Sequence, residues 1–188
     1  MKLSQNHFLY YAAGVALLSW LLVKLTGVIE INRAEAPLHS PDYFSKGYIK
    51  WEMSDVGTLK NKVIADEMTH YSDDGTTQLK RLSMLFYNGK TSPWEVNSET
   101  GVLSSGGRDL FLNGQVDISR AGGLGVRELT IRTSNLKVKP EISHAETTEW
   151  AELISPPNKT VGTGMKLVFV EPIRVELLSH VKGKYEKK

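Results

Sequence analysis

The sequence contains no cysteine. This absence excludes disulfide bonds, a thiol nucleophile and any zinc or iron–sulfur centre held by cysteine. It leaves the compartment open, because many exported proteins also fold without disulfides. Charge of one sign is not in excess either: 23 Lys and Arg residues face 21 Asp and Glu residues, which gives a net charge of +2. Because the two signs are nearly balanced, the composition does not indicate a nucleic-acid partner.

Motifs that carry chemistry are equally scarce. None of the five histidines lies at a metal-binding spacing from another, and there is no Gly-x-Ser-x-Gly elbow. Asp73 and Asp74 precede Gly75, so a turn explains the two carboxylates better than acid–base chemistry does. Residues 89–91 resemble the end of a phosphate-binding loop, but Met84 stands where its first glycine should be. We therefore predict no enzyme activity, no cofactor and no metal.

One long uncharged run lies near the N-terminus. Residues 7–23 contain no charged side chain, and the apolar character resumes after Lys24 as far as residue 29. A helix over residues 8–29 would be roughly 33 Å long, enough to cross a hydrocarbon core of about 30 Å. The run is too long for the core of a usual signal peptide, and a helix that is apolar on every face does not fit a small soluble core. We predict an uncleaved, single-span membrane anchor.

This anchor divides the chain unequally. We expect a short N-terminus over residues 1–7, the membrane helix over 8–29, a polar linker over 30–45 and one soluble domain over 46–186. Two positive charges flank each side of the helix, so the positive-inside rule does not fix its direction. The N-terminal side is too short to hold a domain, and any functional site must therefore follow the helix.

The soluble part shows the alternation of apolar and polar residues that is typical of strands. Asp74-Gly75 and Asn88-Gly89 are strong hairpin signals, because these residues tolerate positive φ. Strands of this length between such turns predict an all-β fold, either an antiparallel sandwich, a jelly roll or an open barrel. The alternating runs are 82–86, 94–96, 110–118, 129–133 and 173–177.

The run 110–118 carries Leu, Leu, Gly, Val and Ile at its even positions, which would form one aliphatic stripe. The stripe is either part of a filled core or the lining of a ligand groove, and alternation does not separate the two. A slip of one residue in register would reverse every inward position. The inward residues predicted from this pattern are Leu82, Met84, Phe86, Trp94, Val96, Leu110, Leu112, Val116, Ile118, Leu129 and Ile131.

Several segments, in their order along the chain, resemble the LptC family. This family consists of single-span inner-membrane proteins of the lipopolysaccharide transport bridge in Gram-negative bacteria. One departure is Ser155-Pro-Pro157, where glycine is common in the family. The segments that carry the resemblance are Tyr71-Ser-Asp73, Trp94-Glu-Val96, Leu110-Phe-Leu-Asn-Gly-Gln-Val-Asp-Ile118, Leu129-Thr-Ile-Arg-Thr133, Gly164-Met-Lys-Leu167 and the closing residues Val181 to Glu186.

The resemblance implies an open, twisted antiparallel β-jelly roll in the periplasm, preceded by one membrane helix with its N-terminus in the cytoplasm. The inward residues would then bind lipopolysaccharide acyl chains received from the ATP-driven transporter of LptB, LptF and LptG. The N-terminal edge would join LptF and LptG, and the C-terminal edge would join LptA. The edge residues implied in this way are Tyr48, Ile49 and Trp51 at the first edge, and Ile173, Val175, Leu177, Val181 and Tyr185 at the last.

Two hypotheses of different classes follow. The first is a non-enzymatic lipopolysaccharide relay, and the second is a membrane-anchored periplasmic scaffold domain with a filled core and no lipid. A relay needs no catalytic residues, which agrees with the lack of a nucleophile–base pattern in the sequence.

Overall fold

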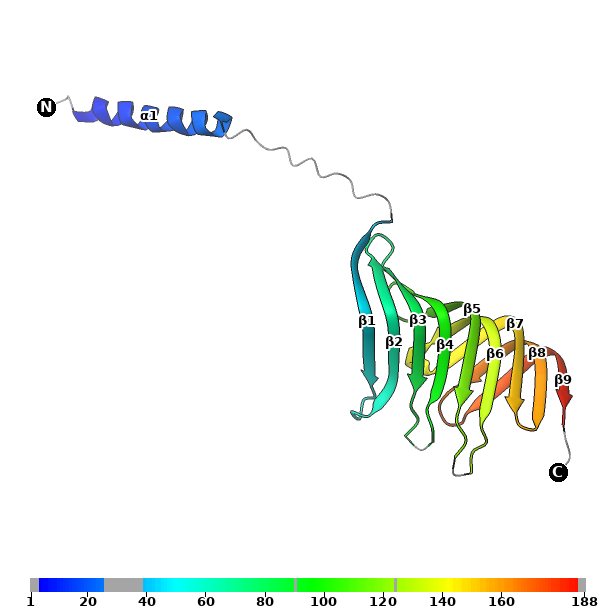
Figure 1. Cartoon of the computed structure of the whole chain (residues 1–188). Helices are drawn as coiled ribbons and strands as arrows, with labels where there is room; N and C mark the ends of the chain where they lie inside the picture. Colours follow the sequence, from blue (N-terminus) through cyan, green and yellow to red (C-terminus); the bar gives the residue numbers. More distant parts are fainter. Residues whose placement is uncertain (1–3, 26–38, 90, 124, 186–188) are drawn as a thin grey trace. The chain divides into compact units, whose positions relative to one another are not determined.

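The structure is a computed structural model, and it describes residues 4–25, 39–89, 91–123 and 125–185. The chain forms two compact units, Met1–Pro37 and Leu38–Lys188. The first unit contains one helix and the second contains a single β-sheet (Figure 1).

Helix α1 (Ser4–Leu25) contains the uncharged run. Leu, Ala and other good helix formers fill it, and its one glycine, Gly14, does not interrupt it. Large apolar side chains are exposed at successive positions on all faces, and His7–Leu25 is long and apolar enough to cross a membrane. The helix begins at Ser4 and not at Phe8 as predicted, because the polar residues before the apolar run are also compatible with helix. Residues 26–29 of the predicted helix lie outside the described residues.

The second unit is one nine-stranded sheet in which each strand pairs antiparallel with its neighbour in the chain. This confirms the predicted all-β, open antiparallel fold, with the strand order of a meander. The strands are β1 (Pro41–Met53), β2 (Leu59–Tyr71), β3 (Thr76–Phe86), β4 (Trp94–Leu103), β5 (Leu110–Arg120), β6 (Leu129–Lys139), β7 (His144–Ser155), β8 (Asn158–Val168) and β9 (Arg174–Lys184).

Two details differ from the predicted layout. Strand β1 begins at Pro41, so residues 41–45 belong to the sheet and not to the linker, while residues 30–38 lie outside the described part. Proline is tolerated there because the first residue of an edge strand need not donate a backbone hydrogen bond. A short 3₁₀ turn, η1 (Pro140–Ile142), also follows β6, where no helix was expected.

A line of backbone irregularities crosses the middle of the sheet. Positive φ values occur in β1, β3, β5, β6, β8 and β9, and register shifts interrupt the pairing of β4 with β5 and of β7 with β8. Such bulges bend a strand and increase its twist. We call this row the fold line, because it divides the strands into two halves. The positive-φ residues on it are Gly47, Arg81, Gly114, Asn135, Gly164 and His180.

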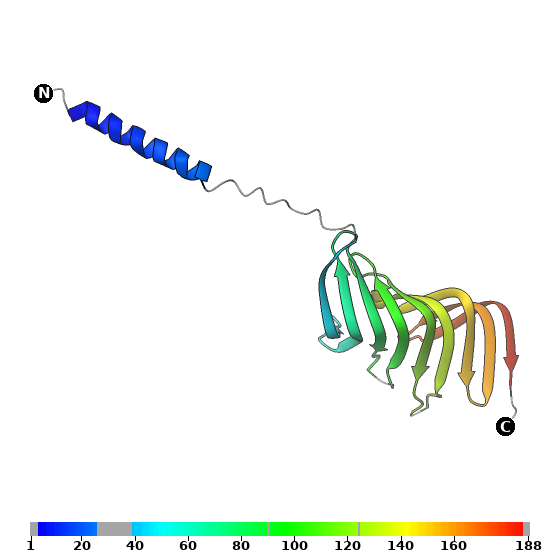
Figure 2. The ribbon, with the colours of Figure 1, turned by 45° about the horizontal axis from the view of Figure 1, so that its top comes forward.

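The sheet therefore folds over on itself, and its two layers enclose the core (Figures 1 and 2). Across this interior Phe86 of β3 stacks on Phe169, which follows β8, with ring centroids 4.1 Å apart. At one margin Lys60 of β2 donates a hydrogen bond of 2.7 Å to the carbonyl of Glu141 in η1. Segments far apart in the sequence thus close the interior from both sides.

Candidate functional site

A cavity of about 400 Å³ lies in the folded sheet on the side of β1, β2 and β3. This volume falls within the usual range of small-molecule sites. Pro140 and Glu141 of η1 and the β4–β5 turn around Gly106 also line it. Its apolar lining comes from Tyr43, Tyr48, Val63, Met68, Leu79, Met84, Leu103 and Leu110, and its polar lining includes Lys50, Glu52, Asn61, Thr77 and Arg108.

Tyr48 is the less exposed of the two β1 tyrosines in this lining. Burial, together with the nearby Tyr43, raises the pKa of the Tyr48 hydroxyl above its ordinary value. Burying an uncharged hydroxyl beside Val63 and Met84 costs less free energy than burying a phenolate there. The inner wall of the cavity is therefore compatible with an apolar occupant.

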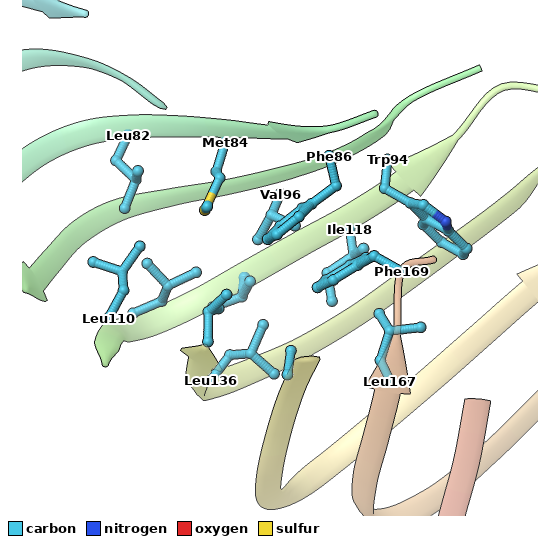
Figure 3. Close-up of a cluster of buried hydrophobic side chains, with 14 of the residues drawn as sticks. Leu82, Met84, Phe86, Trp94, Val96, Leu110, Ile118, Leu136, Leu167 and Phe169 are labelled. Carbon is cyan, nitrogen blue, oxygen red and sulfur yellow. The ribbon is translucent and has the colours of Figure 1, made fainter. Parts of the chain in front are cut away.

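All of the predicted groove residues lie on the inner face, but most of them do not line the cavity. Leu129 is partly buried against the core, and the others are at most 2% exposed. Met84 and Leu110 alone among them appear in the cavity lining. Figure 3 shows five of the remainder packed together and close to Leu167 and Phe169 of the facing layer; these five are Leu82, Phe86, Trp94, Val96 and Ile118. Their role in binding lipid stays a prediction.

Phe169 fills the centre of this packed region. Its ring lies 4.1 Å from the ring of Phe86 in a parallel stack and 5.9 Å from Trp94 in an edge contact (Figure 3). The guanidinium of Arg120 lies over the Trp94 ring, 4.6 Å from its centroid. This part of the stripe is a filled core, whereas the part beside β1 and β2 is hollow.

Alternation missed several inner residues because the fold line shifts it by one position. In β3 the inward side chains after Arg81, which has a positive φ, are Leu82 and Met84, but the inward side chain before it is Leu79. A three-residue step between apolar positions was the available signal for this irregularity. Phe169 lies outside every strand, so no periodicity could indicate it. The inner residues missed are Val63, Met68, Leu79, Leu103, Leu136, Val138, Met165, Leu167 and Phe169.

Asn61 is the buried polar group of the cavity. It is 1% exposed, and its Nδ2 atom has no hydrogen-bond partner in the described part of the chain. The adjacent Lys60 forms an ion pair of 3.4 Å with Glu52 and the hydrogen bond to Glu141. A buried amide donor therefore lies next to a charged rim.

The two edges of the sheet carry the residues that the family resemblance implied for partner binding. Within the described residues, β1 pairs only with β2, and β9 only with β8. Ile49 and Trp51 are exposed, but Tyr48 faces the cavity, so it is not available on the outer face. Val181 on β9 and Tyr185, directly after that strand, are exposed. Ile173, Val175 and Leu177 are partly buried against the core.

A further polar cluster lies at the start of β1. One ligand atom each from His39, Asp73 and Asp74 lies within 4.8 Å of the others, a geometry that could hold a metal ion. The imidazole of His39 also stacks on Tyr71 at 4.1 Å, and its Nδ1 lies 3.2 Å from the Asp73 carboxylate. All three ligand residues are exposed. Sequence spacing did not reveal the cluster, because the histidine comes from before β1 and the aspartates from the β2–β3 turn.

Comparison with known proteins gives two matches and one negative result. A family model described as "Lipopolysaccharide-assembly, LptC-related" matches residues 9–186. The chain also resembles the crystal structure of LptH from Pseudomonas aeruginosa, described as the LptA homologous periplasmic component of the conserved lipopolysaccharide transport device. That likeness has a TM-score of 0.52 and 10% identity, and it covers 68% of this chain and 95% of the other. No curated protein matches in sequence.

The structural likeness is too distant in sequence to show more than the fold. It agrees with the open, folded-over β-sheet described above. The family match is of a different kind, because its residues, 9–186, include both helix α1 and the sheet. The chain therefore belongs to the LptC family of lipopolysaccharide-assembly proteins, and its role lies in the lipopolysaccharide transport bridge.

Proposed function

We propose that the protein is a non-enzymatic relay that holds lipopolysaccharide acyl chains between the two layers of its sheet. The observation that carries this proposal is the apolar cavity of about 400 Å³ beside the free edge strand β1. Burying one methylene group is worth about 0.8 kcal/mol, so even part of an acyl chain would bind with several kcal/mol.

The open sheet suits such a ligand. A closed barrel would force a molecule with a large polar head group to thread its chains through an end. A sheet with two free edges admits the chains sideways while the head group stays in water. The charged residues Lys50, Glu52 and Arg108 at the rim are compatible with a polar head group outside.

The packed centre sets a condition on transfer. The contact between Phe86 and Phe169 bridges the layers, so chains that enter beside β1 reach β9 only if the layers separate there. We infer that the cavity is the entry site and that onward movement requires this contact to open. The protein shows no nucleotide-binding motif in its sequence, so the transporter would supply the energy.

The partners follow from the two edges. In this proposal β1 extends the sheets of LptF and LptG, which act with the ATPase LptB, and β9 extends the sheet of LptA. Strand addition of this kind gains backbone hydrogen bonds that a free edge otherwise leaves to water. Residues 8–29 would anchor the protein in the inner membrane with residues 1–7 in the cytoplasm. The linker before β1 would carry the sheet domain, which begins at Pro41, into the periplasm.

Site-specific photo-crosslinking in living cells tests the relay. A photoreactive residue at Met84 or Leu110, both in the cavity lining, should capture lipopolysaccharide. The matched control is Phe111, the neighbour of Leu110 in β5, whose side chain is 40% exposed on the outer face. Equal capture at Leu110 and Phe111, or capture at Phe111 alone, would contradict an internal site.

The filled centre favours a second candidate, the scaffold domain without lipid. Most of the inner face is at most 2% exposed, as in an ordinary core. This candidate predicts no capture at Met84 or Leu110 and no lipid in the purified protein, while both edges still bind their partners.

A further inference from the structure

The cavity contains a donor that the protein itself does not use. The side chain of Asn61 lines the cavity and is 1% exposed, and its Nδ2 has no hydrogen-bond partner in the described residues. Leaving a buried amide unsatisfied costs stability, whereas an apolar side chain of the same size would not incur this cost. An unsatisfied donor on a side chain that lines a cavity points to a ligand that supplies the acceptor.

The surroundings define that ligand. Val63 and Met84 line the cavity beside Asn61, and Lys60 holds the margin through Glu52 and the Glu141 carbonyl. Thr77, another polar residue of the lining, is already satisfied, because its hydroxyl lies 2.9 Å from Nδ1 of His70. Asn61 therefore differs from its polar neighbours in having a free donor inside the apolar part.

We propose that Asn61 is a specificity-determining residue that donates a hydrogen bond to an oxygen carried on an acyl chain near its polar end. The cavity then prefers hydroxylated acyl chains to plain hydrocarbon chains of equal length. This inference rests on the proposed function, because it assigns a chemical preference to the same cavity. A neutral hydrogen bond of this kind corresponds to a preference of about 2- to 10-fold.

A competition experiment on the full chain in lipid nanodiscs measures this preference. The probe is tetradecanoic acid with a photoreactive diazirine, and its attachment to cavity peptides is quantified by mass spectrometry. The competitors are tetradecanoic acid and 3-hydroxytetradecanoic acid, tested on the wild type, Asn61→Leu and the control Asn113→Leu, which lies at an exposed position of β5 outside the cavity lining. The fraction of a competitor that enters the bilayer is the same for every variant. This fraction therefore cancels when the effect of one competitor is compared between variants.

The advantage of the hydroxylated over the plain competitor should be about 2- to 10-fold greater against the wild type and Asn113→Leu than against Asn61→Leu. The melting temperature of Asn61→Leu should be no lower than that of the wild type, because an unsatisfied donor has been removed. A structural role for Asn61 would instead lower it.

The outcomes separate this inference from the proposed function. If the probe does not label the cavity at all, the relay itself is wrong. If the probe labels the cavity but the advantage of the hydroxylated competitor is the same in the wild type and Asn61→Leu, only the role of Asn61 is wrong. If Asn61→Leu fails to fold, Asn61→Ala takes its place and should lose the same advantage.

Discussion

Phe169 holds the two layers of the sheet together from a position outside any strand. Its ring lies on Phe86 and against the edge of Trp94, and its backbone N–H donates to the carbonyl of Ser143 at 3.0 Å. All three aromatic residues are at most 1% exposed. A single aromatic side chain thus contacts both layers at the point where the cavity gives way to filled core.

Replacing this residue should weaken the fold and enlarge the interior. Phe169→Ala should lower the free energy of unfolding by about 3–5 kcal/mol, the usual cost of removing a buried phenylalanine. Urea denaturation in mild detergent, followed by tryptophan fluorescence, measures the change. Phe111→Ala is the control, because an exposed aromatic over Lys137 should cost less than about 1 kcal/mol. Similar losses in both variants would contradict the bridging role of Phe169.

The pKa of the Asp74 carboxyl group is lowered by hydrogen bonds within the turn that contains it. The Thr76 hydroxyl donates to its carboxylate at 2.7 Å and the Thr76 backbone N–H at 2.8 Å, and these hydrogen bonds lower the pKa of Asp74 below its ordinary value of 3.8. The ionised carboxylate is therefore favoured in the folded state. This contribution to stability is present above the ordinary pKa and is lost as the pH falls through the lower, folded value.

Thr76→Val removes the first of these donors. The pKa of Asp74 should rise toward its ordinary value, and it should remain low in Thr76→Ser, which keeps a hydroxyl. Carboxyl titration by nuclear magnetic resonance measures both. An unchanged pKa in Thr76→Val would show that the hydroxyl does not stabilise the ionised form.

At the scale of elements, the fold line explains both the success and the limits of alternation. Within each half strand the period of two holds, so Leu82, Met84 and Phe86 were placed inward from the sequence alone. The pattern fails at Arg81, where φ is 47° and the register of inward residues shifts. An arginine carries no local signal for this conformation, unlike Gly75, whose turn was predicted. Alternation also did not predict the cavity. Most of the apolar lining of the cavity comes from β1, from β2 or from the halves of the other strands that lie beyond the fold line.

The bend between β5 and β6 offers a direct test of the fold line. Asn135 has a φ of 48°, and its Oδ1 accepts a hydrogen bond of 3.0 Å from the backbone N–H of Gly114, which has a φ of 76°. Asparagine tolerates this conformation better than most residues, and its amide joins the two bulges. Asn135→Ala should lower the free energy of unfolding by about 1–3 kcal/mol through lost hydrogen bonding and backbone strain.

Asn135→Gly separates the two causes. Glycine keeps the backbone conformation without strain, so only the hydrogen bond is lost and the cost should be about 1 kcal/mol. Chemical denaturation measures both variants. If glycine costs as much as alanine, the strained conformation at the bend contributes nothing.

At the scale of the whole molecule, one chain contains an apolar helix, α1, and a β-sheet domain. Alkaline phosphatase fused after Lys188 tests the proposed direction, because this reporter folds only where disulfides form. We expect an active fusion, and an inactive one when residues 4–25 are deleted. An inactive fusion of the full-length chain, present in normal amount, would place the sheet on the cytoplasmic side.

The last prediction concerns what the helix does besides tethering. Its side chains are exposed at successive positions on all faces, and Ala12 and Ala16, four residues apart, form a small-residue site where another helix can approach closely. We expect an unrelated apolar helix in place of residues 4–25 to restore membrane attachment and lipopolysaccharide capture. It should not restore normal control of the ATPase rate of the reconstituted transporter. Ala12→Leu should reproduce that defect, whereas Leu17→Ala should not. If the unrelated helix restores the ATPase rate in full, the helix is a tether alone and the communication with the transporter must pass through β1.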